Sequence, residues 1–486
     1  MQKRIVAYYV GQLFIILAFF MVAPIALAIY DSSHRAMYAY AISAVLSLSL
    51  GFSLRLISNK FKVSELKISR KEAFGIVAFG WVGTGIMSGL PFLFEGSITS
   101  LSSSTFEAIS GLTTTGATVV ANVEELSRAT NLWRVILHWV GGMGIVVLFV
   151  AIFPQLGLGG KHLFKTEVAG PINEGLKPRI KQTALRLWWL YMFFTAACTG
   201  LLFLAGLPIF DAVCHALSTL STGGFSTKAA SVGYFENPLA EWIIIFFMII
   251  GGISFNLYYG LFRGKVSKLF KSVEARLFVG INLIVGLTVF LTTVKSDMSS
   301  WHESFRDAFF QTAAITTTTG LMTADFDLYP IISKYLLFLC MFVGGCAGST
   351  AGGLKVSRVL IVIKRCMQEL RLTLHPQEVV STKLGKQKVS RSIISSVFIF
   401  VCTYFLLYIF GVFLMFALGM DWVSAASSVV ASFSSVGPGF GAVGPTQNYE
   451  FVHPIGKMIL CFYMIAGRLE IFVLLTVFTP SFWRKG

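Results

Sequence analysis

A run of small hydroxyl residues, Thr316-Thr317-Thr318-Thr319, ends at Gly320 inside a strongly apolar sequence. It follows the segment Phe305 to Ala314, which is too short to cross a bilayer, and precedes the longer apolar segment Ile331 to Val343. Irregular backbone at membrane depth is tolerated only where protein buries it or where it lines a water-filled cavity. Because hydroxyls and carbonyls on such a loop can replace the water around a cation, the run predicts a cation-binding loop.

The same pattern occurs three more times, at intervals of roughly a hundred residues, and such regular spacing marks an internal repeat. Each copy follows a short apolar segment and lies between two longer ones. The four loops are Leu112 to Ala117, Leu220 to Phe225, Ile315 to Gly320 and Phe433 to Pro438. The alternative is a set of unrelated Ser/Thr/Gly turns, but turns between spans usually lie outside the apolar core.

The composition indicates a polytopic membrane protein, with 55% hydrophobic and 13% charged residues, against about 25% charged residues in soluble proteins. The net charge of +16 does not indicate nucleic-acid binding, because the basic residues fall in short blocks between apolar spans. Such blocks mark cytoplasmic loops, and their positions predict that both termini are cytoplasmic. Acidic residues gather on the opposite side, either as an acidic outer mouth that attracts cations or simply as solvated loops.

The apolar segments predict an N-terminal hairpin of two spans and four repeats of outer span, short pore segment, loop and inner span. The predicted boundaries are 1–72 for the hairpin and 73–182, 183–275, 276–390 and 391–486 for the repeats. Ser104 and Glu107 have the spacing of a capping box at the start of the first pore segment. Asp211 and Asp421 are the predicted caps of the second and fourth pore segments.

Two features lie in the predicted inner spans. The third inner span is interrupted by a glycine-rich run from Gly344 to Lys355, and each glycine costs about 1 kcal/mol relative to alanine in a helix. This predicts a loop that lines the pore below the third cation-binding loop, the alternative being glycines that allow close helix packing. Arg468 lies in the last span, either facing the pore or in a structural ion pair with Glu470 or with an acidic residue elsewhere.

The four loops, the glycine-rich interruption and Gly467-Arg468 together resemble the TrkH/TrkG potassium-uptake proteins of the Trk/Ktr/HKT cation transporter superfamily. The resemblance covers essentially the whole chain. It implies an all-α polytopic membrane protein with four pseudo-repeated units of outer helix, pore helix, filter loop and inner helix. These units surround one central pore, and an N-terminal two-helix hairpin is added to them.

The resemblance also implies that potassium is the transported ion and that the loops form its selectivity filter. The implied filter residues are Thr114, Thr115, Gly116, Ser221, Thr222, Gly223, Thr318, Thr319, Gly320, Ser435, Val436 and Gly437. Because Gly224 follows Gly223, the register of the second loop is open by one residue. The implied gate residues are Gly345, Gly348, Ser349, Thr350, Gly352, Gly353 and Arg468.

The location and partners implied by the resemblance are a bacterial inner membrane, a homodimer and a cytoplasmic TrkA-like nucleotide-binding regulatory subunit. The basic loop Lys364–Arg391 is the expected docking face, although it could equally contact anionic lipid. No organic cofactor is expected in this chain.

The expected function is channel-like, gated potassium uptake. The alternative is a proton- or sodium-coupled symporter, which would require acidic residues within the membrane, whereas those of this chain lie mostly at span ends. An enzyme is not supported, because no nucleophile, base or metal-ligand cluster is evident. The potassium-to-sodium selectivity, the gating nucleotide, proton coupling and the dimer face are left open by the sequence.

Overall fold

The described part of the chain is almost entirely helical. The computed structural model describes residues 2–58, 69–144, 180–261, 267–295, 300–378, 381–385 and 387–484. Within these ranges the only sheet is a two-stranded antiparallel hairpin of β1 (Lys383–Leu384) and β2 (Gln387–Lys388). Six helices are long and apolar enough to cross a membrane, or seven if one bent pair is counted as a span. The chain is therefore an all-α, multi-pass membrane protein, as the sequence predicts.

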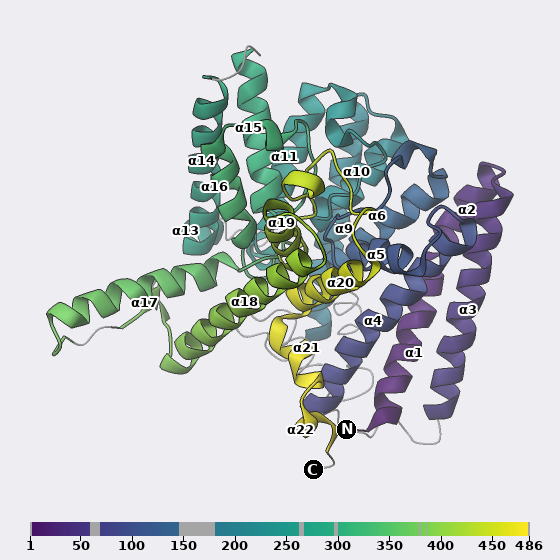
Figure 1. Cartoon of the computed structure of the whole chain (residues 1–486), viewed down its shortest axis with the longest axis horizontal. Helices are drawn as coiled ribbons and strands as arrows, with labels where there is room; N and C mark the ends of the chain where they lie inside the picture. The colour runs from purple at the N-terminus through teal and green to yellow at the C-terminus, as the bar shows by residue number, and fades with distance from the viewer. Residues whose placement is uncertain are drawn as a thin grey trace.

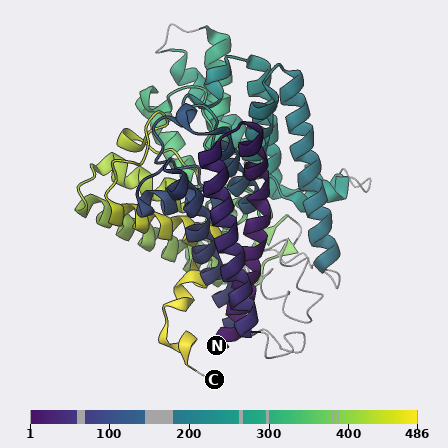
Figure 2. The same cartoon turned by 90° about the vertical axis from the view of Figure 1, so that its right-hand side faces the viewer.

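The N-terminal hairpin consists of α1 (Lys3–Phe20), α2 (Val22–Tyr30) and α3 (His34–Ser58). Figure 2 shows α1 and α3 side by side in purple. A Cβ atom at Gly11 would lie 2.6 Å from the carbonyl oxygen of Gly51, so these two glycines allow the helices to cross closely. The first of the two predicted N-terminal spans is divided at Met21, since Pro24 cannot donate the hydrogen bond that would continue the first helix.

Four units with the same helix order follow the hairpin. The outer helices are α4 (Arg70–Glu95), α9 (Ile180–Leu204), α14 (Val273–Thr293) and α18 (Arg391–Ala417). The pore helices are α5 (Leu101–Leu112), α10 (Ile209–Ser221), α15 (Trp301–Thr316) and α19 (Trp422–Phe433). The inner helices begin with α6 (Arg128–Gly142), α11 (Pro238–Gly252), α16 (Ile331–Phe342) and α20 (Pro454–Leu469). This order follows the predicted five-part division, whose boundaries stay predictions.

The inner helices are interrupted in the second, third and fourth units, although the sequence predicted a break only in the third. The chain continues as α12 (Phe255–Leu261), α17 (Val356–Leu374) and α21 (Ile471–Val477), the last bent by 120° from α20. In the first unit α6 ends at Gly142, and the remainder of the predicted inner span from residue 145 on, with the basic loop behind it, lies outside the described residues. The shorter elements are α13 (Ser267–Lys271), α22 (Pro480–Trp483) and the 3-10 turns Val123–Glu125, Ser231–Phe235, Phe326–Leu328 and Gly441–Val443.

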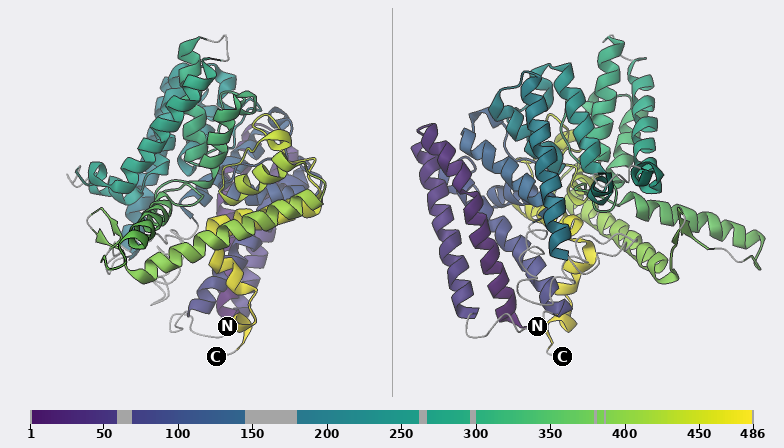
Figure 3. Two further views of the ribbon diagram at one scale, coloured as in Figure 1. Left: turned by 60° about the vertical axis from the view of Figure 1, so that its left-hand side comes forward. Right: turned by 180° about the vertical axis from the view of Figure 1, so that it is seen from behind.

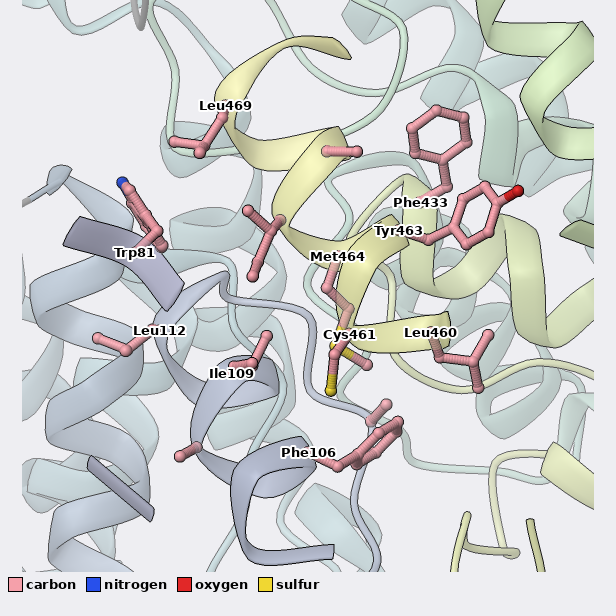
Figure 4. Close-up of a cluster of buried hydrophobic side chains, with 14 of the residues drawn as sticks. Trp81, Phe106, Ile109, Leu112, Phe433, Leu460, Cys461, Tyr463, Met464 and Leu469 are labelled. Carbon is pink, nitrogen blue, oxygen red and sulfur yellow. The ribbon is translucent and has the colours of Figure 1, made fainter. Parts of the chain in front are cut away.

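The pore helices are held in an apolar core. Figure 4 shows α20 crossing α5, with Phe106 and Ile109 facing Cys461 and Met464. A Cβ atom at Gly141 or Gly467 would lie within 3.0 Å of the carbonyl oxygen that ends a pore helix, at Leu112 or Phe433. Glycine at these positions therefore lets each inner helix approach the end of a pore helix, which fixes where the following loop begins.

The predicted pore-helix caps are confirmed in one case and wrong in two. Asp421 caps α19 by accepting from Ser424 N at 3.1 Å, and hydrogen bonds from the Ser424 side chain and backbone hold the pKa of Asp421 below its usual value. Helix α5 is capped by Ser100 instead of Ser104, since its first turn lies four residues earlier than this cap predicts. Asp211 lies inside the first turn of α10 and accepts from Thr227 Oγ1 at 2.5 Å.

Both termini lie at the same end of the molecule (Figure 1). Lys71 Nζ, at the start of α4, donates to Ser481 O at 2.8 Å and to Arg484 O at 3.2 Å. Helix α17 projects from the body on the side opposite the N-terminal hairpin, as Figure 1 and the right-hand view of Figure 3 show. The left-hand view of Figure 3 shows α18 in light green, leading from this projection back to the body.

Candidate cation pathway

The four predicted loops share one backbone conformation. Each has a hydroxyl residue with positive φ, one intervening residue, and a glycine with positive φ. The φ angles are 55° and 81° at Thr114 and Gly116, 54° and 90° at Thr222 and Gly224, 56° and 73° at Thr318 and Gly320, and 57° and 98° at Ser435 and Gly437. Positive φ is uncommon for residues other than glycine, so its recurrence identifies the four loops as copies of one structure.

The four loops form a closed ring. A Cβ atom added at the glycine of any loop would lie within 3.0 Å of a carbonyl oxygen in the next loop. The facing pairs are Gly116 and Gly223, Gly224 and Thr319, Gly320 and Val436, and Gly437 and Thr115. Because the fourth glycine faces the first loop, the loops surround a single axis in chain order. Only glycine has room for this contact.

The ring resolves the register of the second loop. Gly224 has the conformation and the contact of Gly116, whereas Gly223 takes the place of Thr115. Ser221 therefore corresponds to Thr113, one position before the residues proposed as ligands in the other loops. The imidazole of His138 explains the extra glycine, because a Cβ atom at Gly223 would lie within 3.0 Å of that ring.

The loop hydroxyls divide into two groups. Those of Thr113 and Thr317 bond back to their pore helices, at Ile109 O (2.7 Å) and Ala313 O (2.6 Å), and each also bonds the threonine two residues later. The hydroxyls of Thr114 and Ser435 are buried and find no hydrogen-bond partner among the residues that the structure describes. These two oxygens are therefore available to a bound cation or water.

The glycine-rich interruption lies directly against the loops. The chain is irregular between the end of α16 at Phe342 and the start of α17 at Val356. Thr350 Oγ1 donates to Leu220 O at 3.1 Å and to Gly251 O at 3.0 Å, while Gly352 N donates to Thr318 Oγ1 at 2.7 Å. This segment, called here the inner loop (residues 343–355), is thus joined to the second and third units. The predicted break in the third inner helix is therefore present, and its glycines Gly345 and Gly352 also approach neighbouring backbone closely.

Arg468 fastens the inner loop to the first unit. Its guanidinium donates to Thr350 O at 2.8 Å and to the carbonyl oxygens of Gly141 and Gly142, the latter at 2.8 Å. The alternative of an ion pair with Glu470 is not seen, since Glu470 accepts from Arg358 Nη2 at 2.6 Å. Arg468 therefore joins three elements of the lower pore through backbone oxygens.

A cavity lies on each side of the ring. All four ring glycines line an outer cavity, together with Arg134 and Lys228. The inner cavity is lined by residues of the inner loop and by Arg468. The four loops and the inner loop thus lie between two cavities.

The outer cavity is not acidic. No carboxylate is among its lining residues in the described part of the chain. Two acidic side chains of this side hold loops in place: Glu124 accepts from Ala229 N at 2.8 Å, and Asp327 accepts from Gly441 N at 2.9 Å. The expected acidic mouth is therefore not found at this cavity, although Glu95, Glu125 and Glu450 line a second cavity on the same side.

The buried charged residues around the ring were not predicted from the sequence. Glu107 was interpreted as part of a helix cap, yet it pairs with Arg134 at 2.8 Å, and the two side chains are 0% and 2% exposed. Two charged residues in apolar segments, Glu107 just after Phe106 and Arg134 within a predicted span, were the available signal.

Comparison with known proteins gives one consistent family. A family model described as TrkH, cation transport protein, matches residues 39–485. The Trk system potassium uptake protein TrkH of Salmonella typhimurium is 39% identical, with all of both chains covered. TrkG of Escherichia coli K12 is 33% identical over 99% of each chain. The crystal structure of the potassium transporter TrkH from Vibrio parahaemolyticus superposes with a TM-score of 0.87 at 36% identity over all of both chains.

Proposed function

Because this chain belongs to the TrkH family of cation transport proteins, as its sequence motifs indicated, we propose that it takes up potassium through the ring of four loops. The family consists of transporters, not enzymes. The closed ring of glycine and carbonyl contacts is the observation that supports a filter most directly. Carbonyl oxygens held around one axis can replace the hydration shell of a potassium ion.

The proposed ligands are the backbone carbonyls of Thr115, Gly223, Thr319 and Val436, with the hydroxyl residues one position earlier. The free hydroxyls of Thr114 and Ser435 support an ion position at the inner end of this ring. Since the second loop is one residue out of the expected register, Gly223 and Gly224 replace Thr222 and Gly223 as the counterparts of Thr115 and Gly116.

The first test replaces Gly320 with serine. A side chain at this position would meet the carbonyl oxygen of Val436 and would also occupy a backbone conformation with φ of 73°. We expect potassium flux into liposomes to fall roughly tenfold or to lose its preference over sodium, because the carbonyl that Gly320 faces must move. The measurement is potassium, rubidium, sodium and lithium flux through purified protein, without a proton gradient.

Gly206→Ser is the matched control. Gly206 also has positive φ, 99°, but no atom lies within 4 Å of the position where its Cβ would be. It therefore tests backbone strain without contact to the ring. Equal flux and selectivity in the Gly320 variant and this control would contradict the filter.

A proton- or sodium-coupled symporter is the alternative. Coupling requires an acidic side chain that exchanges its ion during transport. The buried Glu107 and Glu241 are each paired with an arginine, Arg134 and Arg306, which makes them poor exchange sites. Flux that requires a proton gradient in the same liposomes would favour the symporter.

The gate is proposed to be the inner loop with Arg468. Its contacts to Leu220, Gly251 and Thr318 put it against the inner face of the ring, and Arg468 adds a positive charge there. A cation leaving the ring toward the inner cavity would meet both the inner loop and the charge of Arg468. This arrangement supports a closed state in which the loop blocks the inner cavity.

The remaining proposals concern the setting of the protein. We propose a bacterial inner membrane with both termini in the cytoplasm, which agrees with their position at one end of the molecule (Figure 1). A homodimer and a cytoplasmic TrkA-like nucleotide-binding subunit complete the proposed assembly. The projecting α17 and the β1–β2 hairpin are the proposed contact for that subunit.

A further inference from the structure

The ion pair between Glu107 and Arg134 is the most deeply buried one in the described part of the chain. It joins the pore helix α5 to the inner helix α6. A buried ion pair contributes little to folding compared with well-packed apolar residues, because both charges lose their hydration. The hydrogen bonds from this ion pair to neighbouring segments therefore indicate a role other than stabilising the fold.

Glu107 holds the chain that leaves the first loop. Its carboxylate accepts from Val119 N at 2.9 Å and from Thr118 Oγ1 at 3.0 Å. Thr118 and Val119 come two and three residues after the ring glycine Gly116. The position of this exit segment is thus fixed by one buried carboxylate.

Arg134 holds the exit of the second loop as well. Its Nη1 donates to Ser226 O at 3.2 Å, and its guanidinium lies 4.2 Å from the centre of the Phe225 ring. Phe225 and Ser226 directly follow the ring glycine Gly224. Its Nη2 also donates to Thr118 Oγ1 at 3.1 Å, so one guanidinium contacts the exits of two adjacent loops. The planar fork of arginine suits this task and lysine does not.

The fourth loop is connected to the same network. Tyr449 N donates to Thr118 O at 2.8 Å, and the Tyr449 hydroxyl donates to Gly437 O at 2.9 Å. The network therefore reaches three of the four ring glycines from the side of the outer cavity, which Arg134 and Tyr449 also line.

We propose that Glu107 and Arg134 are positioning residues that set the ion selectivity of the ring. The pair fixes where the first, second and fourth loops leave the ring, and hence the spacing of the carbonyls that face the cation. This inference rests on the proposed function of the ring as a filter.

Glu241 and Arg306 provide a matched control pair. They also join a pore helix to an inner helix, α15 to α11, and Glu241 is 3% exposed. Among the described residues, their side chains make no hydrogen bond to a segment that follows a ring glycine. A variant of this pair therefore disturbs a similar ion pair without a link to the ring.

The experiment compares Glu107→Gln, Arg134→Lys and Glu241→Gln in liposomes with equal amounts of monodisperse protein. We expect the potassium-to-sodium flux ratio to fall roughly fivefold or more in the first two variants and to stay unchanged in the third. Equal ratios in Glu107→Gln and Glu241→Gln would overturn the proposal.

Thr118→Val is the second variant, in case removal of a buried charge prevents folding. It deletes the hydroxyl that Glu107 and Arg134 share but leaves the ion pair in place. A lowered flux ratio supports the proposal, and a wild-type ratio overturns it. The Gly320→Ser protein distinguishes failure of the filter proposal from failure of the positioning proposal. If Gly320→Ser transports potassium like wild type, the ring is not the filter. If Gly320→Ser changes transport but the Thr118 and Glu107 variants do not, only the positioning role is refuted.

Discussion

Arg468 brings a positive charge to the point where three backbone segments meet. Replacing it with glutamine removes this charge and weakens the bonds to Thr350 O and Gly142 O. We expect potassium flux to rise roughly tenfold, because a cation leaving the ring no longer meets a fixed positive charge in a narrow, poorly hydrated space. Flux through single-orientation liposomes, normalised to the amount of folded protein, measures this.

Arg468→Lys distinguishes the charge from the hydrogen bonds. Lysine keeps the charge but cannot reach the carbonyls of two elements at once in the fixed geometry of the guanidinium. Wild-type flux in this variant would assign the barrier to charge. An Arg468→Gln protein that folds normally and conducts no faster than wild type would show that Arg468 is not a barrier.

At the residue scale, the sequence predicted the features that recur in all four loops and missed those that occur only once. The four ring glycines were found to within one residue, because each loop carries the same pattern of hydroxyl residues and glycine. The shift from Gly223 to Gly224 could not be predicted, since it depends on the His138 ring from another unit. The ion pair of Glu107 and Arg134 was missed because the two residues are brought together only by helix packing.

At the scale of elements, the inner loop differs from an ordinary connection because its backbone bonds to a filter loop. Gly352 N donates to Thr318 Oγ1, and Cys346 N donates to Gly252 O at 2.8 Å. Deleting residues 347–351 keeps both ends of the loop while removing Thr350. We expect potassium flux to rise on the order of tenfold, because a mostly closed pathway opens. The potassium-to-sodium ratio should change little, since the ring glycines are untouched.

Thr350→Ser is the control for the deletion. Serine retains the hydroxyl that bonds Leu220 O and Gly251 O, so its flux should equal that of wild type. Unchanged flux in the deletion variant would count against a gate, and a changed ion ratio would mean that the loop is part of the filter.

The breaks in the second and fourth inner helices were not predicted from the sequence. The third break was predictable because glycines are dense between Gly344 and Gly353. The bend between α20 and α21 occurs at Glu470, with φ of 64°, in a sequence without a helix-breaking pattern. The ion pair of Glu470 with Arg358 accompanies that bend, and only the folded chain brings these two residues together.

At the scale of the whole molecule, the four repeats surround one axis. Helix α17 is the part of the chain that extends farthest from them (Figure 1). The hairpin beside it places Lys383 opposite Lys388 in antiparallel register, with both residues exposed. Like charges directly opposite each other are unfavourable in a strand pair, so an acidic surface is the partner that best fits this hairpin. Lys386, which also belongs to the basic loop expected to dock a partner, lies outside the described residues.

The docking prediction uses the double reversal Lys383→Glu and Lys388→Glu. We expect affinity for a purified TrkA-like subunit to fall roughly tenfold to a hundredfold, because like charges would face each other at the interface. The matched control reverses two exposed lysines outside the hairpin, Lys3 and Lys271, and so changes the net charge equally. Titration of the TrkA-like subunit in nanodiscs of neutral lipid separates subunit binding from lipid binding. If both double variants lose affinity for the subunit, the effect is one of general charge. If the hairpin variant keeps its affinity for the subunit, the hairpin is not the docking site. A loss confined to the hairpin variant would connect the projecting α17, whose first residue follows the inner loop directly, to control of the pore.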